Sequence, residues 1–415
     1  MKIKIRKKYL FYALAFSAAI ISAINSGLDA TVGKLFIPDP WALGFSIFFV
    51  GIFVAIIFSL FFSIKKGKKS LGQMYIDPSF RKIRLIKKEE IKYQIFAAFG
   101  NATFTVGYFA LFTIVKDPSV VLPFSQVVIL YLVFLESINE KDMPTLPELQ
   151  SVTIVTFGAI LGSISLSGSI NLESLLIVFF VINPGWVILT IYQRKLKWMK
   201  IDDNYNDSIN IRLWNVIFAC IITAIMIFIY DIFSNSAHLL NGIQSSIDYF
   251  GWVFIISTGA FFAIILYIRA LGIGKASIAQ AVRSSTIIFS IPVSILIAHL
   301  GIIDQFSLEP TLLLIKIIGI IIMSLGIISF ALTLVKAYIF IRIKPGIPIE
   351  KTMQELWKIR GVSRVTAVAG PYDIIIKIRI RTLVKGYEKI ITKIGSIPGI
   401  KEYRWMSVLK EWEDI

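Results

Sequence analysis

The chain has 415 residues, of which 56% are hydrophobic, and its mean hydropathy is +0.77. This composition excludes an ordinary soluble protein and predicts a polytopic membrane protein. A formal charge of +17 would suggest nucleic acid as a partner in a soluble chain. Here the basic residues gather in short segments between apolar runs, which indicates the cytoplasmic side of a membrane protein instead.

Ten apolar runs follow one another along the first 334 residues, and we predict that they are ten membrane-spanning helices. Lys and Arg fall on alternate ends of these runs, and the segment from 65 to 92 alone carries ten of them. Only Lys34 and Lys116 lie on the predicted outer side. We therefore expect a multi-pass protein of the cell membrane with both termini in the cytoplasm. The predicted spans are Leu10–Ala30, Trp41–Ser63, Tyr93–Val115, Val120–Leu135, Leu149–Leu166, Leu172–Tyr192, Leu213–Phe233, Tyr249–Ala270, Ile278–Ile297 and Leu312–Leu334.

Two short motifs occur twice in this region. The segment 161–166, Leu-Gly-Ser-Ile-Ser-Leu, is similar to 325–330, Leu-Gly-Ile-Ile-Ser-Phe, and the segment 108–116 is similar to 267–275. Five is an odd number of spans, so a second copy of five enters the membrane from the opposite face. The repeat predicts two inverted halves, residues 1–166 and 167–334, with a substrate near their interface.

This layout resembles the EamA family of the drug/metabolite transporter superfamily over about residues 10 to 334. The shared features are the five-plus-five order, Pro40 before the second span, short turns between spans three and four and between eight and nine, and glycines in spans five and ten. The resemblance implies a ten-helix carrier of small metabolites. The family's Gly-Glu pair at the end of the fourth helix is Leu135-Glu136 here.

Beyond residue 335 the composition changes, and alternating apolar residues predict strands separated by two amphipathic helices. The expected order is βαββαβ, a ferredoxin-like α+β domain over 335–415. The turn Gly370-Pro-Tyr-Asp373 before an Ile-rich strand, and the exits Ile359-Arg-Gly-Val362 and Ile397-Pro-Gly-Ile400, resemble the effector-binding (RAM) domain of Lrp/AsnC regulators. The resemblance implies an amino-acid effector and a homo-oligomer formed through this domain. The DNA-reading helices of those regulators are absent, so no nucleic acid is expected as a partner.

Arg283 is the one charged residue of the ninth predicted span, roughly 8 Å from its inner end by helical rise. A charge at that depth usually faces a cavity or a partner. One interpretation is that Arg283 attracts the carboxylate or phosphate of an anionic or zwitterionic substrate. The alternatives are that it extends to the headgroups or pairs with Glu136.

Other polar and amphipathic residues of the spans are candidates for the same transport cavity. Asp29 and Lys34 are expected to neutralise each other at the rim, and the alternative is that Asp29, with Asn25, coordinates a substrate amine or a coupling proton. Asn183 begins an Asn-Pro-Gly triplet that is expected to break the sixth helix, either as a wall of the site or as a packing kink. The remaining candidates, whose alternative is hydrogen bonding between helices, are Gln126, Gln280, Tyr108, Tyr267, Trp186 and Glu136.

In the tail, the resemblance assigns an effector site to Gly370, Tyr372 and Asp373. The alternative is plain turn chemistry, in which Asp373 satisfies backbone amides. No catalytic constellation, metal site or cofactor motif is expected, and the chain is not predicted to be an enzyme. The sequence predicts a secondary transporter of small metabolites, working by alternating access under the control of a cytoplasmic sensor domain. The alternative is a membrane-anchored sensor or assembly scaffold that transports nothing.

Overall fold

The computed structural model describes residues 7–114, 122–140, 146–163, 172–201, 203–299, 310–332, 335–359, 361–380 and 385–407. The chain divides into two compact units. The larger, called the helical unit here, comprises Met1–Glu140 and Val152–Leu325. The smaller, called the C-terminal unit, comprises Lys141–Ser151 and Gly326–Ile415.

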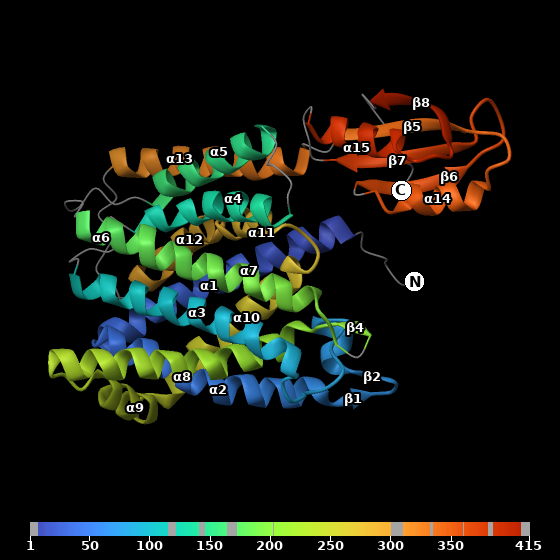
Figure 1. Cartoon of the computed structure of the whole chain (residues 1–415). Coiled ribbons are helices and arrows are strands. Elements are labelled where there is room, and N and C mark those ends of the chain that lie inside the picture. The colour runs from blue at the N-terminus through green and yellow to red at the C-terminus, as the bar shows by residue number, and fades with distance from the viewer. Residues whose placement is uncertain are drawn as a thin grey trace. The chain divides into compact units, whose positions relative to one another are not determined.

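Helices that lie side by side as a bundle make up the helical unit (Figure 1). Helix α1 packs on α10 and α12, while α3 packs on α7 and α8. The helices and their bounds are α1 (Lys7–Leu35), α2 (Pro40–Ser63), η1 (Gly72–Ile76), α3 (Lys88–Ile114), η3 (Leu122–Val127), α4 (Val128–Glu140), α5 (Leu146–Ser163), α6 (Leu172–Ile177), η4 (Val178–Ile182), α7 (Asn183–Trp198), α8 (Ser208–Ser234), α9 (His238–Asp248), α10 (Phe250–Leu271), α11 (Ala276–Arg283), α12 (Thr286–His299) and α13 (Pro310–Leu332). Two short hairpins join helices, one of β1 (Lys65–Lys66) and β2 (Lys69–Ser70), the other of β3 (Lys200–Ile201) and β4 (Asn204–Tyr205).

Each of the ten predicted spans coincides with helix in the described residues. Five helical stretches there are long and apolar enough to cross a membrane, namely Tyr9–Leu35, Pro40–Ser63, Leu172–Trp198, Ser208–Ser234 and Phe250–Leu271. Three shorter helices in the described residues are also apolar, namely Phe124–Glu136, Leu149–Gly162 and Leu313–Ser329. The number of crossings and the inverted orientation of two halves stay predictions. Lys116 and the predicted span ends at Val115, Val120, Leu166 and Leu334 lie outside the described residues.

The ninth predicted span is not one continuous helix. It is divided into α11 and α12 at Ser284 and Ser285, directly after Arg283. The two serine hydroxyls donate to the carbonyls of Gln280 and Val282, at 3.0 and 2.7 Å. Serine side chains that bond to the preceding turn compete with regular helix geometry, and Ser285 N donates to Val282 O, which tightens the turn.

The sixth predicted span does not break at its Asn-Pro-Gly triplet. Residues 172–198 stay helical, and the π-helical turn η4 directly precedes Asn183 and Pro184. The wider turn accommodates a proline, which lacks an amide hydrogen, without ending the helix. Helix α9 was not predicted, because it is short and amphipathic. It lies on α2, where Ser46 Oγ donates to Gly242 O at 2.9 Å.

Glycines allow two pairs of helices to approach very closely. A Cβ on Gly158 of α5 would lie 2.4 Å from the backbone nitrogen of Met323 on α13, and Gly319 of α13 is in the same contact. A Cβ on Gly100 of α3 would lie 2.6 Å from the carbonyl oxygen of Gly185 on α7. Small residues at such crossings are typical of helix packing in membranes.

A buried polar network holds the segment between α2 and α3 against the start of α8. Lys197 Nζ donates to Asp77 Oδ2 at 2.7 Å and to Asn206 O, and Asp77 also accepts from Ser208 N at 2.9 Å. Nearby, Arg84 forms a two-point ion pair with the buried Glu90. Burial alone would raise the pKa of Asp77, but the charge of Lys197 and these hydrogen bonds hold it below its usual value.

The C-terminal unit contains a four-stranded antiparallel sheet of order β6-β7-β5-β8. The predicted order of strands and helices is observed. Its apolar core is built mainly from isoleucines, with Ile339, Ile376 and Ile394 fully buried. The elements are β5 (Val335–Ile343), α14 (Ile349–Trp357), β6 (Val362–Ala367), β7 (Ile374–Ile380), α15 (Lys385–Gly395) and β8 (Ile400–Ser407).

Candidate substrate-binding cavity

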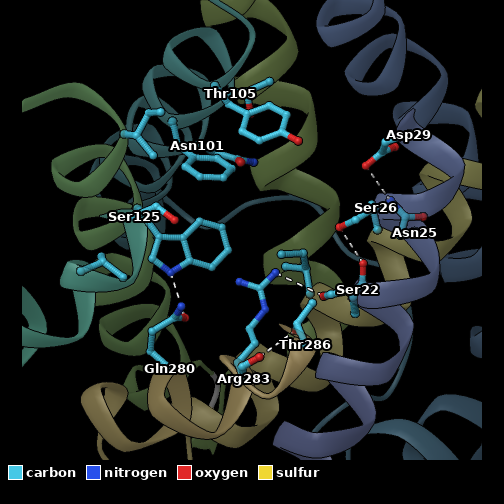
Figure 2. Close-up of a pocket in the computed structure, with 18 of the residues that line it drawn as sticks. Ser22, Asn25, Ser26, Asp29, Asn101, Thr105, Ser125, Gln280, Arg283 and Thr286 are labelled. Carbon is cyan, nitrogen blue, oxygen red and sulfur yellow. Dashed lines mark hydrogen bonds between the residues drawn. The ribbon is translucent and has the colours of Figure 1, made fainter. Parts of the chain in front are cut away.

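A cavity of about 340 Å³ lies among the helices of the helical unit. Such a volume is within the range of small-molecule sites, roughly 300–1,000 Å³. Its walls come from α1, α2, α3, η3, α4, η4, α7, α8, α10, α11 and α12, and polar side chains project into it from several of them (Figure 2). Among its lining residues are eight of the predicted cavity residues, Asn25, Asp29, Tyr108, Gln126, Asn183, Trp186, Gln280 and Arg283.

Arg283 extends into this cavity from the end of α11 (Figure 2). One guanidinium nitrogen donates to Ser22 Oγ at 3.3 Å. The guanidinium carbon lies 4.3 Å from the ring centre of Trp186 and 5.2 Å from that of Tyr267. Contact with two aromatic faces stabilises the cation while leaving its hydrogen-bonding edge available. Nε of Arg283 is buried and has no hydrogen-bond partner.

One face of α1 forms the wall beside Arg283. Ser22, Asn25 and Asp29 lie three and four residues apart, which places them on the same side of the helix, as Figure 2 shows. Asn25 Nδ2 donates weakly to Asp29 Oδ2, at 3.4 Å. Among the described residues, neither Asn25 Oδ1 nor Asp29 Oδ1 has a hydrogen-bond partner. Asp29 forms no ion pair with Lys34 among the described residues, so the expected neutralisation is not observed.

A second arginine, Arg212 at the start of α8, also lines the cavity. Its side chain is buried, and it donates to Asn215 Oδ1 at the long distance of 3.4 Å. Asn101 of α3 donates to the same oxygen at 2.9 Å. Nε of Arg212 and Nδ2 of Asn215 are buried without partners. The cavity therefore contains two guanidinium groups, and only one was predicted.

Trp186, Gln280 and Tyr267 form a hydrogen-bonded layer at one edge of the cavity. Trp186 Nε1 and Tyr267 Oη both donate to Gln280 Oε1, at 3.0 and 3.2 Å. Tyr267 is fully buried behind this layer and does not line the cavity itself. Gln126 accepts a hydrogen bond from Ser284 Oγ at 2.8 Å. Trp186, Gln280 and Gln126 therefore line the cavity and also form the hydrogen bonds between helices that were the alternative prediction. Tyr267 forms only the hydrogen bonds.

Glu136 lies apart from the cavity, at the beginning of α11. Its carboxylate accepts from Ala276 N at 2.6 Å, from Ser277 N at 3.1 Å and from Ser277 Oγ, and it forms an ion pair with Arg194. A carboxylate at a helix N-terminus satisfies amides that have no partner inside the helix. Glu136 pairs with Arg194 and not with Arg283, and it faces a separate pocket of about 370 Å³.

Several polar cavity residues were not predicted from the sequence. Arg212 was interpreted as one of the basic residues that mark a cytoplasmic loop, because it precedes the seventh apolar run. The spacing of Asn101 and Thr105, one turn apart on α3, was a usable signal for a polar stripe on an otherwise apolar helix. The others are single hydroxyls with no signal of their own, Ser22, Ser26, Ser125, Ser284 and Thr286.

The predicted effector turn of the C-terminal unit is bonded closely to strand β5. Asp373 Oδ2 accepts from Ile343 N at 2.7 Å, and Asp373 N donates to Ile341 O at 3.0 Å. Arg342 donates to Pro371 O at 2.8 Å and lies over the ring of Tyr372. Gly370 has a φ of +149°, a conformation that favours glycine. Asp373 therefore has the backbone role given as its alternative.

The comparison with protein families decides the identity of this tail. The family model described as "Lrp/AsnC ligand binding domain" matches residues 336–414. The C-terminal part of the chain is an Lrp/AsnC ligand-binding domain. This match includes Gly370, Tyr372 and Asp373, and it agrees with the four-stranded sheet and two helices of this region.

The remaining comparisons concern the chain as a whole. No curated protein matches it. A solved crystal structure, named only as a protein, is similar with a TM-score of 0.50 and 10% sequence identity, over 78% of this chain and 98% of that chain. The overlap is much longer than the Lrp/AsnC domain, so it includes most of the helical region. At this identity the likeness shows the fold alone.

Proposed function

We propose that the chain is a secondary transporter of small metabolites that works by alternating access and is regulated by its Lrp/AsnC domain. The observation that carries the proposal is the cavity of the helical unit, which holds two arginines inside a bundle of apolar helices. Charged groups in such surroundings are costly and mark pathways for polar cargo. A bundle that only anchored a sensor would have no need of them.

The proposed architecture is ten membrane-spanning helices in two inverted halves, 1–166 and 167–334, similar to the EamA family. In inverted-repeat carriers the site lies between the halves. Asn25 and Asp29 come from the first proposed half and Arg212 and Arg283 from the second, and all four line one cavity. We place both termini in the cytoplasm because Lys and Arg gather on that side of the predicted spans.

The Lrp/AsnC domain is proposed to sense a small molecule, with an amino acid as the first candidate. In this proposal the domain associates with copies of itself, and binding of the effector changes the rate of transport. Tyr372→Ala, which removes a ring at the predicted site without touching the backbone bonds of Asp373, should leave basal transport unchanged and abolish the response to the effector. Initial uptake rates with and without amino acids on the cytoplasmic face measure this.

Transport itself is tested with the full chain in lipid vesicles and a panel of labelled amino acids and organic acids. We expect uptake of one class by wild type, uptake reduced about 10- to 100-fold in Arg283→Gln, and partial rescue in Arg283→Lys, because a hydrogen bond to a charged group contributes about 1.5–3 kcal/mol. Arg81→Gln, an exposed arginine of the same unit, is the control. Full activity of both Arg283 variants would mean that this arginine only anchors the helix. No uptake of any compound would favour the sensor or scaffold.

A further inference from the structure

The two cavity arginines differ in what they bind from three other buried or half-buried cations of the helical unit. Arg84, Arg194 and Lys197 each pair with a carboxylate, those of Glu90, Glu136 and Asp77. Arg212 and Arg283 have no carboxylate within ion-pair distance among the described residues. Their hydrogen bonds go to one amide oxygen at 3.4 Å and one hydroxyl at 3.3 Å.

A guanidinium presents a planar fork of donors that matches a carboxylate or phosphate at two points. Burying such a group without an anion is unfavourable, because no counter-charge offsets the cost of removing it from water. Arg212 is only 6% exposed, and Nε of each arginine lacks a partner. Two positions in the same cavity are therefore ready to receive an anionic group.

The cavity also offers an acceptor for a cation, on α1. Asp29 lines the cavity, and its Oδ1 has no hydrogen-bond partner among the described residues. Asn25 Oδ1 faces α10 instead, because a Cβ on Gly259 would lie only 2.2 Å from it. At 1.5 Å per residue, Asp29 lies about 10 Å along α1 from Ser22, which accepts from Arg283. An ammonium group at Asp29 would be separated from an acid group at Arg283 by roughly two helical turns.

With both arginines and Asp29 ionised, the formal charge of these groups is +1, which a ligand of net charge −1 balances. A simple monoacid satisfies the balance but leaves one guanidinium and the Asp29 carboxylate without a charged partner. We propose that the cavity binds a small molecule with two acidic groups and one amine, of the acidic amino acid class. This inference rests on the proposed transport function and names the class of its cargo. The second acidic group is a carboxylate or a phosphate.

Binding is tested by the thermal unfolding of the purified full chain with matched ligands at millimolar concentration. L-glutamate carries two acids and the amine with a net charge of −1, and O-phospho-L-serine carries the same kinds of group with a net charge of about −1.5 to −2. L-glutamine lacks the second acid, and glutarate lacks the amine. We expect L-glutamate or O-phospho-L-serine to raise the Tm, and whichever binds more tightly identifies the second acidic group. L-glutamine should bind about 10- to 100-fold more weakly, the effect of one lost charged hydrogen bond.

Variants assign each group to its partner. Arg212→Gln and Arg283→Gln should each reduce the ratio of the affinity for L-glutamate to that for L-glutamine. Asp29→Asn should reduce the ratio of the affinity for L-glutamate to that for glutarate. The control Arg81→Gln should change neither ratio. Equal stabilisation by L-glutamine, or no stabilisation by either diacidic amine, overturns the inference.

Uptake into vesicles separates this inference from the function on which it rests. If L-glutamate binds with the expected dependence on the arginines but is not carried across the membrane, the proposed ligand class is supported and the proposed transport function is wrong. If L-glutamine and L-glutamate are carried equally well, the transport function is supported and the proposed ligand class is wrong.

Discussion

Two groups of buried or half-buried charges in the helical unit are satisfied in different ways. Near the ends of the helices, Lys197 and Arg84 pair with the carboxylates of Asp77 and Glu90 at distances of 2.5–2.7 Å. In the cavity, Arg212 and Arg283 make longer bonds to neutral groups. Closed networks rigidify the protein around them, whereas partly satisfied ones keep hydrogen-bonding capacity. The first group is therefore structural, and the second is the candidate for ligand binding.

The largest expected effect comes from breaking a closed pair. Lys197→Met leaves the Asp77 carboxylate, which is 2% exposed, without its cation. Removing one member of a buried pair destabilises a protein by about 3–5 kcal/mol. Thermal unfolding in detergent should show a strong fall in Tm, with Lys200→Met, three residues away and exposed, as the control. Equal Tm values for the two variants would contradict a structural role for the pair.

The Tm of a cavity variant tests whether the second group of charges differs from the first. Arg212→Gln removes a buried charge that has no carboxylate to leave behind. Its Tm should therefore stay near that of wild type or rise above it. A fall as large as that of Lys197→Met would mean that Arg212 belongs with the structural charges and not with the ligand site.

A smaller effect is expected where helices touch through glycine. Gly158→Ala places a methyl group 2.4 Å from the backbone of Met323, so α5 and α13 must separate. Overpacking of this kind destabilises by about 1–3 kcal/mol. Gly251→Ala is the matched control, because a Cβ there has nothing within 4 Å. A Tm difference between these two variants should be seen without ligand, and its absence would show that the crossing tolerates the added atom.

A small, local effect is expected in the C-terminal unit. Asp373→Ala leaves the amide of Ile343 without its acceptor and should cost about 1–2 kcal/mol locally. Hydrogen exchange of the full chain should then speed up at residues 341–343 and stay unchanged in the helical unit. Unchanged exchange at those residues would return Asp373 to the list of effector-binding candidates.

The tail was predictable because its pattern is local. Alternation of isoleucines from Ile374 to Ile380 has the period of a strand, and the observed β7 occupies those residues. The turn at Gly370 was predictable for the same reason. The division of the ninth predicted span was not, because Ser284 and Ser285 lie in a continuous apolar run and only their bonds to the preceding turn end α11.

The cavity was predictable only in part. Arg283 stood out as a charge within an apolar run. Arg212 did not, because an arginine at the end of a span is what the positive-inside rule expects, and only tertiary structure shows that α3 and α8 bury it. Glu136 was predicted as a cavity residue because it is a charged residue at the end of the fourth apolar run. Its place at the N-terminus of α11 depends on how α4 packs on α11, which the sequence pattern does not encode.

Thiol labelling tests the proposed path through the helical unit most directly. The chain has one cysteine, Cys220, so a Cys220→Ala protein provides a background for Ser26→Cys on the cavity wall. In sealed vesicles, we expect a membrane-impermeant maleimide to label residue 26 from either side, and L-glutamate to slow the labelling. Labelling from one side only under every gradient and ligand condition, or from neither side, would contradict alternating access.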